Sequence, residues 1–253
     1  MNGIKICSEN YINEYCSIEP TSGSATKNYL FDQNQNTKWV SEGSNDNIIE
    51  HIAVTFKNWQ GEEIDRDFNR IIILNHNLKF VTFEYYNGTD WINIPGAVLI
   101  IENEAYTIIE ITQPLPIPVS RIRLNCKTTQ IANQEKQIGE LKVCKSIVEE
   151  PDWLSDFSRS DSMRGNDYRL AGGKLVSWKE WTKVSGKLSI ENVSLDNLNI
   201  LLPYMKQNEF ITVIFYQDFN ISDIYEFQIV NAPNFNINRK ERLFNLSLSL
   251  EEK

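Results

Sequence analysis

Short runs of β-branched and aromatic residues recur along this 253-residue chain, and they constrain its fold more than any other feature. In the last run, Phe244, Leu246, Leu248 and Leu250 alternate with polar residues, so one face of a strand is apolar and the other polar. A two-residue period of this kind indicates a half-buried strand and not a helix. Similar runs occupy residues 52–56, 70–74, 79–86, 120–126, 138–144, 210–218 and 224–232. The pattern therefore predicts a mostly β protein.

Turn and helix patterns refine this prediction. Asn87-Gly88 stands between two strand runs, and this dipeptide is a strong indicator of a β-hairpin. One helix is predicted over 195–207, where Ser194 can cap the first turn and leucines recur on one face. Pro203 is expected to kink or restart that helix, because proline cannot donate a backbone hydrogen bond.

The length and a change of pattern predict two domains. A chain of this size is comfortable as two compact units, and 41% apolar residues can fill two cores. The alternation stops at the charged and proline-containing stretch VEEPDW (148–153). We therefore predict a first domain over 1–147, a linker or arm over 148–173 that is rich in Ser, Asp and Gly, and a second domain over 174–253.

Charge and motifs argue against several classes of function. The net charge of −9 is spread over both halves with no basic stripe, so we expect no nucleic-acid sequence recognition. No run of about 18 apolar residues occurs, so no membrane association is expected, and the N-terminus MNGIKICSEN lacks the pattern of a signal peptide. Four cysteines without a CxxC pair predict buried thiols. Without a GxSxG, HExxH or P-loop motif, we expect that the chain is not an enzyme.

Six segments of the first half occur in a familiar order. They are LFDQNQNTKWV, IAVTF, FNRIIIL, FEYYNGTDWINI, PVSRIRLNC and IGELKVC. Together they resemble a discoidin domain, the coagulation-factor type C, galactose-binding-like module shared with many carbohydrate-binding modules. The resemblance implies an antiparallel jelly-roll sandwich in which Trp39 and Trp91 pack in the core. The predicted fold is therefore mostly β, with this jelly roll followed by a β-sandwich or barrel-like domain that carries one short helix.

The resemblance also implies a site for structural calcium. In sugar-binding members, the loop that corresponds to Asp32 through Thr37 often wraps the ion together with a residue matching Glu140. Asp32, Asn34, Thr37 and Glu140 carry the oxygen ligands that calcium prefers. Gln33, however, stands where the family usually has glycine. A polar turn held by side-chain hydrogen bonds is the alternative, with no cofactor at all.

Glycan-binding members display aromatic residues on loops at one end of the jelly roll, with an Arg or His beside them. The corresponding candidates for a ligand site are Tyr11, Tyr15, Tyr29, Trp59 and His76. Each aromatic ring is equally compatible with packing at the rim of the core. A lone histidine after a buried strand is more often a satisfied turn residue than a ligand.

The second half is similar in pattern to small tail-tube or tail-tip proteins of phages. An R-x-x-G-G segment (169–173), a short leucine-rich helix and a final Leu/Ser alternation carry this resemblance, and IIILNHNL (71–78) is similar to discoidin-like domains of phage tails. The resemblance implies assembly as a homo-oligomeric ring with other tail proteins. The residues expected to anchor the arm on a neighbouring subunit are Phe157, Met163, Tyr168, Arg169 and Leu170.

These observations lead to two hypotheses of different class. The first is a structural component of a phage tail or tail-like particle, made in the bacterial cytoplasm and located in the virion, whose jelly roll faces outward toward a host-surface glycan or a partner protein. The alternative is a soluble carbohydrate-binding protein with an accessory β domain. The missing export signal favours the first, because a secreted lectin needs export.

Overall fold

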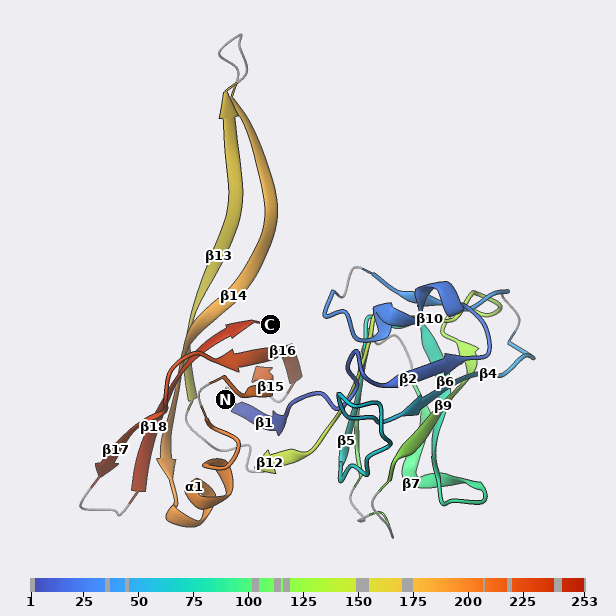
Figure 1. The fold of residues 1–253 in the computed structure, drawn as a ribbon, viewed down its shortest axis with the longest axis horizontal. Helices are drawn as coiled ribbons and strands as arrows, with labels where there is room; N and C mark the ends of the chain where they lie inside the picture. The colour runs from blue at the N-terminus through green and yellow to red at the C-terminus, as the bar shows by residue number, and fades with distance from the viewer. Residues whose placement is uncertain are drawn as a thin grey trace. The chain divides into compact units, whose positions relative to one another are not determined.

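A computed structural model gives the fold of the chain, which divides into two compact units (Figure 1). The jelly-roll unit is Asn10–Lys145, and the discontinuous unit combines Met1–Glu9 with Ser146–Lys253. The structure describes all residues except 1–2, 35–36, 44–45, 102–104, 112–114, 116–118, 149–154, 170–174, 207, 218–219, 239–242 and 253. Within the described strands, side chains are not described at 3, 148, 155–156, 161–169, 175–183, 192, 216–217, 220–223 and 237–238.

Antiparallel sheets build the jelly-roll unit. The five-stranded sheet has the order β2 (Ser17–Pro20), β4 (Glu50–Thr55), β9 (Arg121–Thr129), β6 (Leu78–Tyr86) and β7 (Trp91–Ile100). The three-stranded sheet has the order β11 (Glu140–Cys144), β5 (Arg70–Leu74) and β8 (Tyr106–Glu110). A short pair of β3 (Trp39–Val40) and β10 (Gln137–Ile138) and the 3-10 helix η1 (Ser24–Leu30) complete the unit.

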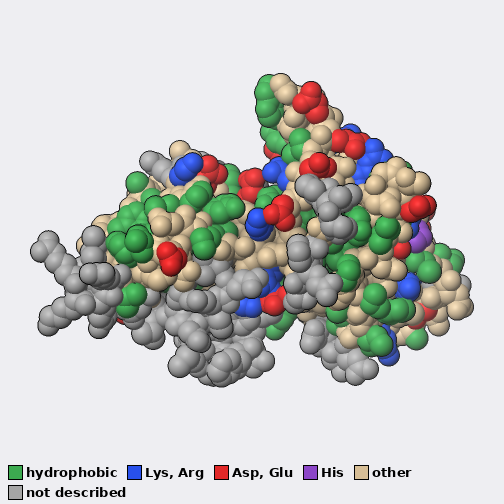
Figure 2. Space-filling view, turned by 90° about the horizontal axis from the view of Figure 1, so that it is seen from below, with side chains coloured by type: hydrophobic (Ala, Val, Ile, Leu, Met, Phe, Trp, Pro, Cys, Tyr) green, Lys and Arg blue, Asp and Glu red, His purple; other side chains and the backbone are tan. Residues whose placement is uncertain are grey.

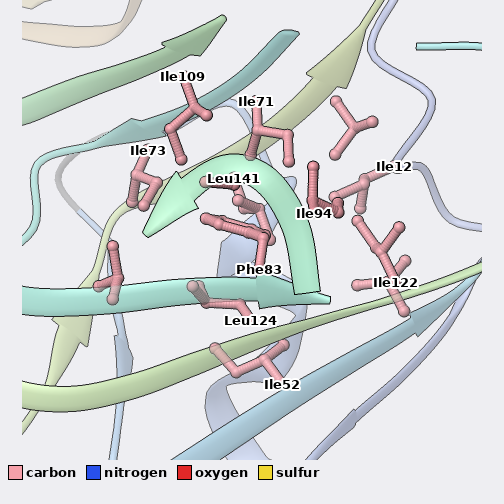
Figure 3. Packing of buried hydrophobic residues seen from close by; sticks show 14 of the residues in the cluster. Ile12, Ile52, Ile71, Ile73, Phe83, Ile94, Ile109, Ile122, Leu124 and Leu141 are labelled. Atoms are coloured by element: carbon pink, nitrogen blue, oxygen red, sulfur yellow. The ribbon is translucent and has the colours of Figure 1, made fainter. Parts of the chain in front are cut away.

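The two larger sheets bury their facing sides in one core. Figure 3 shows Ile71, Ile73 and Leu141 of the three-stranded sheet packed against Phe83 and Leu124 of the five-stranded sheet. These residues stand at alternating positions of their strands, as the two-residue period predicts. The mostly β sandwich expected from the sequence is confirmed.

Trp39 and Trp91, both predicted to pack in the core, lie in different environments. Trp39 is fully buried, and its indole N–H donates a hydrogen bond to the carbonyl oxygen of Ser22 at 3.2 Å, which confirms its predicted core position. The prediction for Trp91 was wrong. Trp91 begins β7 opposite Tyr86 and is half-buried on the outer face of the five-stranded sheet, because Ile94 and Ala97 provide the core contacts of that strand.

The described residues of the discontinuous unit form one large antiparallel sheet and one helix. The sheet order is β12 (Ser146–Val148), β1 (Gly3–Ser8), β15 (Phe210–Gln217), β16 (Asn220–Ile229), β18 (Leu243–Glu252), β14 (Leu175–Val193) and β13 (Ser155–Arg169), with β17 (Asn234–Asn238) paired to β18. Helix α1 (Leu195–Leu201) adds Leu198 and Leu201 to the core beside the sheet. Ser194 caps the helix as expected, and the helix ends before Pro203, shorter than the predicted 195–207.

The domain boundary differs from the prediction at the N-terminus. The sequence places residues 1–147 in one domain, whereas β1 belongs to the discontinuous unit. Each residue of β1 has a partner on β15, from Gly3 opposite Tyr216 to Ser8 opposite Ile211. The jelly roll is therefore inserted into a unit whose first strand precedes it in the chain.

The predicted linker or arm over 148–173 also differs. Residues 155–169 form β13, which pairs with β14 along its whole length. Phe157, predicted to anchor the arm on a neighbouring subunit, packs within its own unit, with its ring 5.0 Å from that of Phe215 and 5.6 Å from that of Phe227. The side chains of Met163, Tyr168 and Arg169, and the whole of Leu170, lie outside the described part of the chain.

Candidate functional site

The two ends of the jelly roll separate the predicted ligand residues into two groups. Strand directions place residues 10–16, 56–69 and 87–90 at the end where the chain enters and leaves the unit. Tyr11, Tyr15 and Trp59 belong to this end. Tyr29 and His76 lie at the opposite end, near the loops over 41–49 and 130–136. The five candidates therefore do not form one site.

The aromatic residues at the entry end differ in the solvent exposure of their rings. Tyr11 lies beneath the guanidinium of Arg66 at 4.7 Å and packs against the core. Trp59 is 74% exposed at the tip of a turn that Asn58 organises by accepting hydrogen bonds from the backbone N–H groups of Gln60 and Glu62. Tyr15 is also exposed. Trp59 and Tyr15 are thus available for contact, whereas Tyr11 is a rim residue.

His76 is a buried turn residue. Its Nδ1 accepts a hydrogen bond from the backbone N–H of Leu78 at 3.1 Å, and its Nε2 lies 2.9 Å from the hydroxyl of Thr107. Burial lowers the pKa of His76 to about 4 from its ordinary value of 6.5. The imidazole is neutral at pH 7, and both of its nitrogens are engaged within the fold.

In the predicted calcium loop, the described residues Asp32, Asn34 and Thr37 form hydrogen bonds with one another. One carboxylate oxygen of Asp32 accepts from the backbone N–H of Asn34 at 2.9 Å, and the other accepts from the hydroxyl of Thr37 at 2.6 Å. The side chain of Glu140 accepts from the ammonium of Lys142 at 2.6 Å. Among the described residues, no group of three or more His, Cys, Asp or Glu side chains is arranged to hold a metal ion. The contacts of Asp32 with Asn34 and Thr37 are those of a polar turn held by side-chain hydrogen bonds.

The outer face of the five-stranded sheet carries a row of aromatic and charged side chains that the sequence analysis did not identify. Arg123 lies 4.5 Å above the ring of Trp91 and donates from Nε to Glu84 at 2.7 Å. The ring of Trp91 is 5.4 Å from that of Tyr86. Arg121 lies 5.6 Å from the centre of the Tyr86 ring. These residues stand on β6, β7 and β9, which are neighbours in the sheet.

Further polar contacts extend this row at both ends. At one end Arg121 pairs with Glu63, which follows Trp59 in the same loop. At the other end, Asn125 donates to the hydroxyl of Thr82 at 3.0 Å, and its amide oxygen lies 2.6 Å from Nδ1 of His51. We name Glu63, Glu84, Tyr86, Trp91, Arg121 and Arg123 the aromatic–arginine surface.

The charges of this surface are balanced within it. Partial burial opposes ionisation of Glu84, but hydrogen bonds from Asn125 and Arg123 and the charge of Arg123 together lower its pKa. Hydrogen bonding to Glu63 raises the pKa of Arg121. The surface therefore presents fixed donors and acceptors beside aromatic rings. The alternation in SRIRLNC contained the necessary information, since Arg121 and Arg123 alternate with the core residues Ile122 and Leu124.

Acidic and basic side chains are also interspersed elsewhere. On the face shown in Figure 2, described Asp or Glu side chains lie beside Lys or Arg at several places, among apolar patches.

In the described part of the chain, no helix has the length and apolarity that crossing a membrane would require.

Solved structures of carbohydrate-binding modules are similar to part of this chain. One is the family 32 carbohydrate-binding module from Clostridium perfringens NanJ in complex with galactose, with 15% identity, a TM-score of 0.44, and coverage of 55% of this chain and 99% of that one. Another is chitosan-binding module 1 from a Paenibacillus chitosanase/glucanase, with 15% identity, a TM-score of 0.41, and coverage of 53% and 98%.

A third similar structure is an F5/8 type C domain from Bacteroides fragilis, with 16% identity, a TM-score of 0.41, and coverage of 52% of this chain and 91% of that one. No family model matches the sequence, and no curated protein matches it. Each of these similarities covers a little over half of this chain. The resemblance of the second half to tail proteins stays a prediction.

Proposed function

We propose that the jelly-roll unit binds a carbohydrate on the aromatic–arginine surface and that the role of the protein is binding and not catalysis. The observation that carries this proposal is the contact row in which Arg123 joins the ring of Trp91 to the carboxylate of Glu84. Sugars present apolar C–H faces and hydroxyl groups at once. An aromatic ring can cover the first, while guanidinium donors and carboxylate acceptors bind the second.

The surface is open enough for this role. The side chains of Arg121 and Glu63 are both 41% exposed, whereas those of Arg123 and Glu84 are 25% and 15% exposed. Paired charges keep the polar atoms in place before a ligand arrives, which reduces the entropy cost of binding. The exposed Trp59 in the loop of Glu63 can extend the contact beyond the sheet.

A glycan array with the full-length protein tests this proposal, followed by calorimetry with the glycan that binds best. We expect Trp91→Ala to raise the Kd at least about tenfold, because removal of a stacking ring costs on the order of 1.4 kcal/mol or more. Tyr29→Ala is the matched control, since Tyr29 lies at the opposite end of the unit, and it is expected to keep the Kd.

Two results would contradict the proposal. One is the absence of binding to any glycan on the array. The other is a Trp91→Ala protein that binds as tightly as the parent, above all if Tyr29→Ala is the change that weakens binding. Circular dichroism of each variant establishes that a loss of binding is not a loss of fold.

A second candidate function is the structural role in a phage tail or tail-like particle, with assembly through the discontinuous unit. The observation that favours it is the ribbon formed by β13 and β14. β14 pairs with β18 only over Ser185–Val193, and Ser160 stands opposite Ser185. Beyond this point, 161–169 and 175–184 pair only with each other among the described strands, and Figure 1 shows them extending from the sheet.

A ribbon of this kind favours association. An isolated two-stranded hairpin is marginally stable in water, and its two open edges can pair with another chain. A second copy of this chain is the proposed partner. The ribbon sequence contains acidic and basic residues in similar number, including Asp161, Arg164, Asp167 and Arg169. Such a mixture is compatible with self-association, because like charges do not dominate.

Shortening the ribbon tests this second function. We expect the full-length protein to form oligomers in mass photometry, and a variant with residues 161–184 replaced by Asn-Gly to be monomeric. Ser160 and Ser185 are paired, so a two-residue turn can join them, and the buried side chain of Val184 is the core contact that the replacement removes. Trp59→Ala in the jelly-roll unit is the control. A monomeric parent protein, or a shortened variant that assembles normally, would remove the support for the tail function.

A further inference from the structure

Glu140 and Lys142 form a buried ion pair beside the loop in which the sequence resemblance implies calcium. Both stand on β11, two residues apart, and therefore on the same side of the strand. The ammonium of Lys142 donates to the carboxylate of Glu140 at 2.6 Å, and each side chain is only 3% exposed. A buried carboxylate needs a compensating charge, and Lys142 already supplies it.

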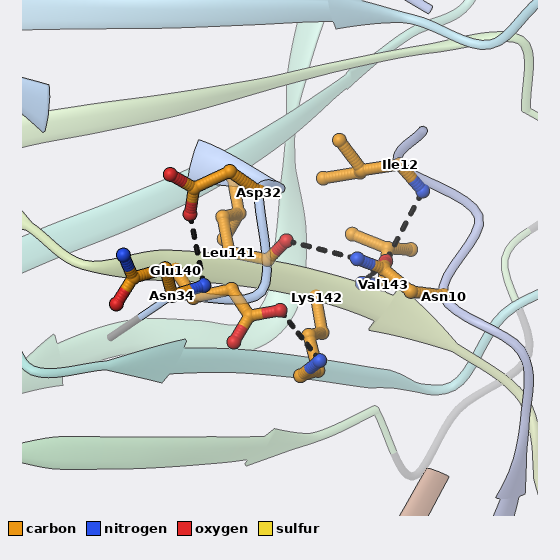
Figure 4. A network of polar contacts seen from close by, with 8 residues as sticks. All are labelled: Asn10, Ile12, Asp32, Asn34, Glu140, Leu141, Lys142 and Val143. Atoms are coloured by element: carbon orange, nitrogen blue, oxygen red, sulfur yellow. Dashed lines mark hydrogen bonds and ion pairs between the residues drawn. The ribbon is translucent and has the colours of Figure 1, made fainter. Parts of the chain in front are cut away.

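The loop residues point to the same conclusion. Both carboxylate oxygens of Asp32 are engaged by Asn34 and Thr37. Figure 4 shows the carboxylate of Glu140 directed toward Lys142 and not toward Asp32. Gln33 adopts a φ of 60°, in the left-handed region, at the position where the family usually has glycine.

The donor set does not fit calcium. The ion takes six to eight oxygen ligands, and its affinity depends on how many of them are charged. Here the charge of Glu140 is cancelled by Lys142, which leaves Asp32 as the one uncompensated carboxylate of the four predicted ligands. An ammonium held within this group would also repel a divalent cation.

We propose that the jelly-roll unit needs no calcium, because the ammonium of Lys142 provides the positive charge that Glu140 requires. The proposal concerns the stability of the unit and is independent of the proposed glycan binding. It predicts that the full-length protein melts at the same temperature in excess chelator and in millimolar calcium. Calorimetric titration of calcium into chelator-treated protein should give no binding heat.

A pair of variants tests the part assigned to Lys142. Lys142→Met removes the ammonium and leaves Glu140 buried without a partner, so the melting temperature is expected to fall by on the order of 10 °C. The double variant Glu140→Gln with Lys142→Met removes both charges at similar volume, and it should recover most of that loss.

The unsubstituted protein decides the question even if Lys142→Met does not fold. A melting temperature that falls in chelator and rises in calcium would overturn the proposal. So would a Lys142→Met protein that is as stable as the double variant, because the ammonium would then not be compensating Glu140. Equal melting temperatures in chelator and calcium, with the single variant less stable than the double, would support it.

Discussion

Replacement of Trp39 by alanine is expected to lower the free energy of unfolding by about 3–5 kcal/mol, which is the range for large-to-small changes at fully buried aromatic residues. Trp39 is fully buried and among the largest fully buried side chains of the chain. The change removes its core packing and the hydrogen bond to the carbonyl of Ser22. A larger residue at the neighbouring Gly23 could not fill the cavity left by the indole, because a Cβ at Gly23 would lie 2.0 Å from the carbonyl oxygen of Val40.

Trp59→Ala is the matched control for this prediction. Trp59 is 74% exposed, so the same chemical change should alter stability by no more than about 0.5 kcal/mol. Urea denaturation followed by circular dichroism measures both variants without depending on tryptophan fluorescence. If Trp39→Ala lowered the free energy of unfolding no more than Trp59→Ala does, the core position of Trp39 would not contribute to the stability of the unit.

Acidification is expected to destabilise the jelly-roll unit through His76 by about 2–3 kcal/mol between pH 7.5 and pH 4.5. Burial lowers the pKa of His76 from 6.5 to about 4 in the folded protein. Between these values the unfolded chain binds a proton that the folded chain does not. Stability is therefore complete above pH 6.5 and is lost as the pH falls toward 4.

His76→Asn isolates this contribution. Asparagine does not titrate, and its side-chain oxygen can accept from the backbone N–H two residues later, as Nδ1 of His76 does from Leu78. Asp46 and Glu84, whose pKa values are lowered, add pH dependence to both proteins and cancel in the comparison. Denaturation midpoints at the two pH values give the difference. Equal pH dependence in the two proteins would show that His76 is not held neutral by burial.

Local patterns were sufficient for much of the fold. The alternation of Phe244, Leu246 and Leu248 predicted a strand, and β18 contains all three. Asn87 and Gly88 predicted a hairpin, and β6 and β7 are joined there, with Gly88 at a φ of 101°. Such predictions succeed because strand period and turn geometry depend on neighbours a few residues apart.

The residues of the candidate site were predicted less well from the sequence than the strands were. Of the predicted ligand candidates, Tyr15, Tyr29 and Trp59 are exposed, and they do not lie together. The aromatic–arginine surface was missed because Trp91 was assigned to the core. A tryptophan in an alternating strand can face either side of a sheet, and only the register between β6 and β7 places Trp91 beside Tyr86 on the outer face.

By itself, the sequence determined the strand content and the cap at Ser194, since each follows from short-range pattern and side-chain chemistry. The core position of Trp39 was implied by the family resemblance, and the structure confirms it. Only the tertiary structure assigned β1 to the discontinuous unit, because its partner on β15 lies some two hundred residues further along the chain (Ile4 opposite Phe215). The ion pair of Glu140 and Lys142 was likewise decided by burial. Two opposite charges at this spacing are ordinary on an exposed strand. Only their burial in the folded sheet makes Glu140 require the positive charge that Lys142 provides.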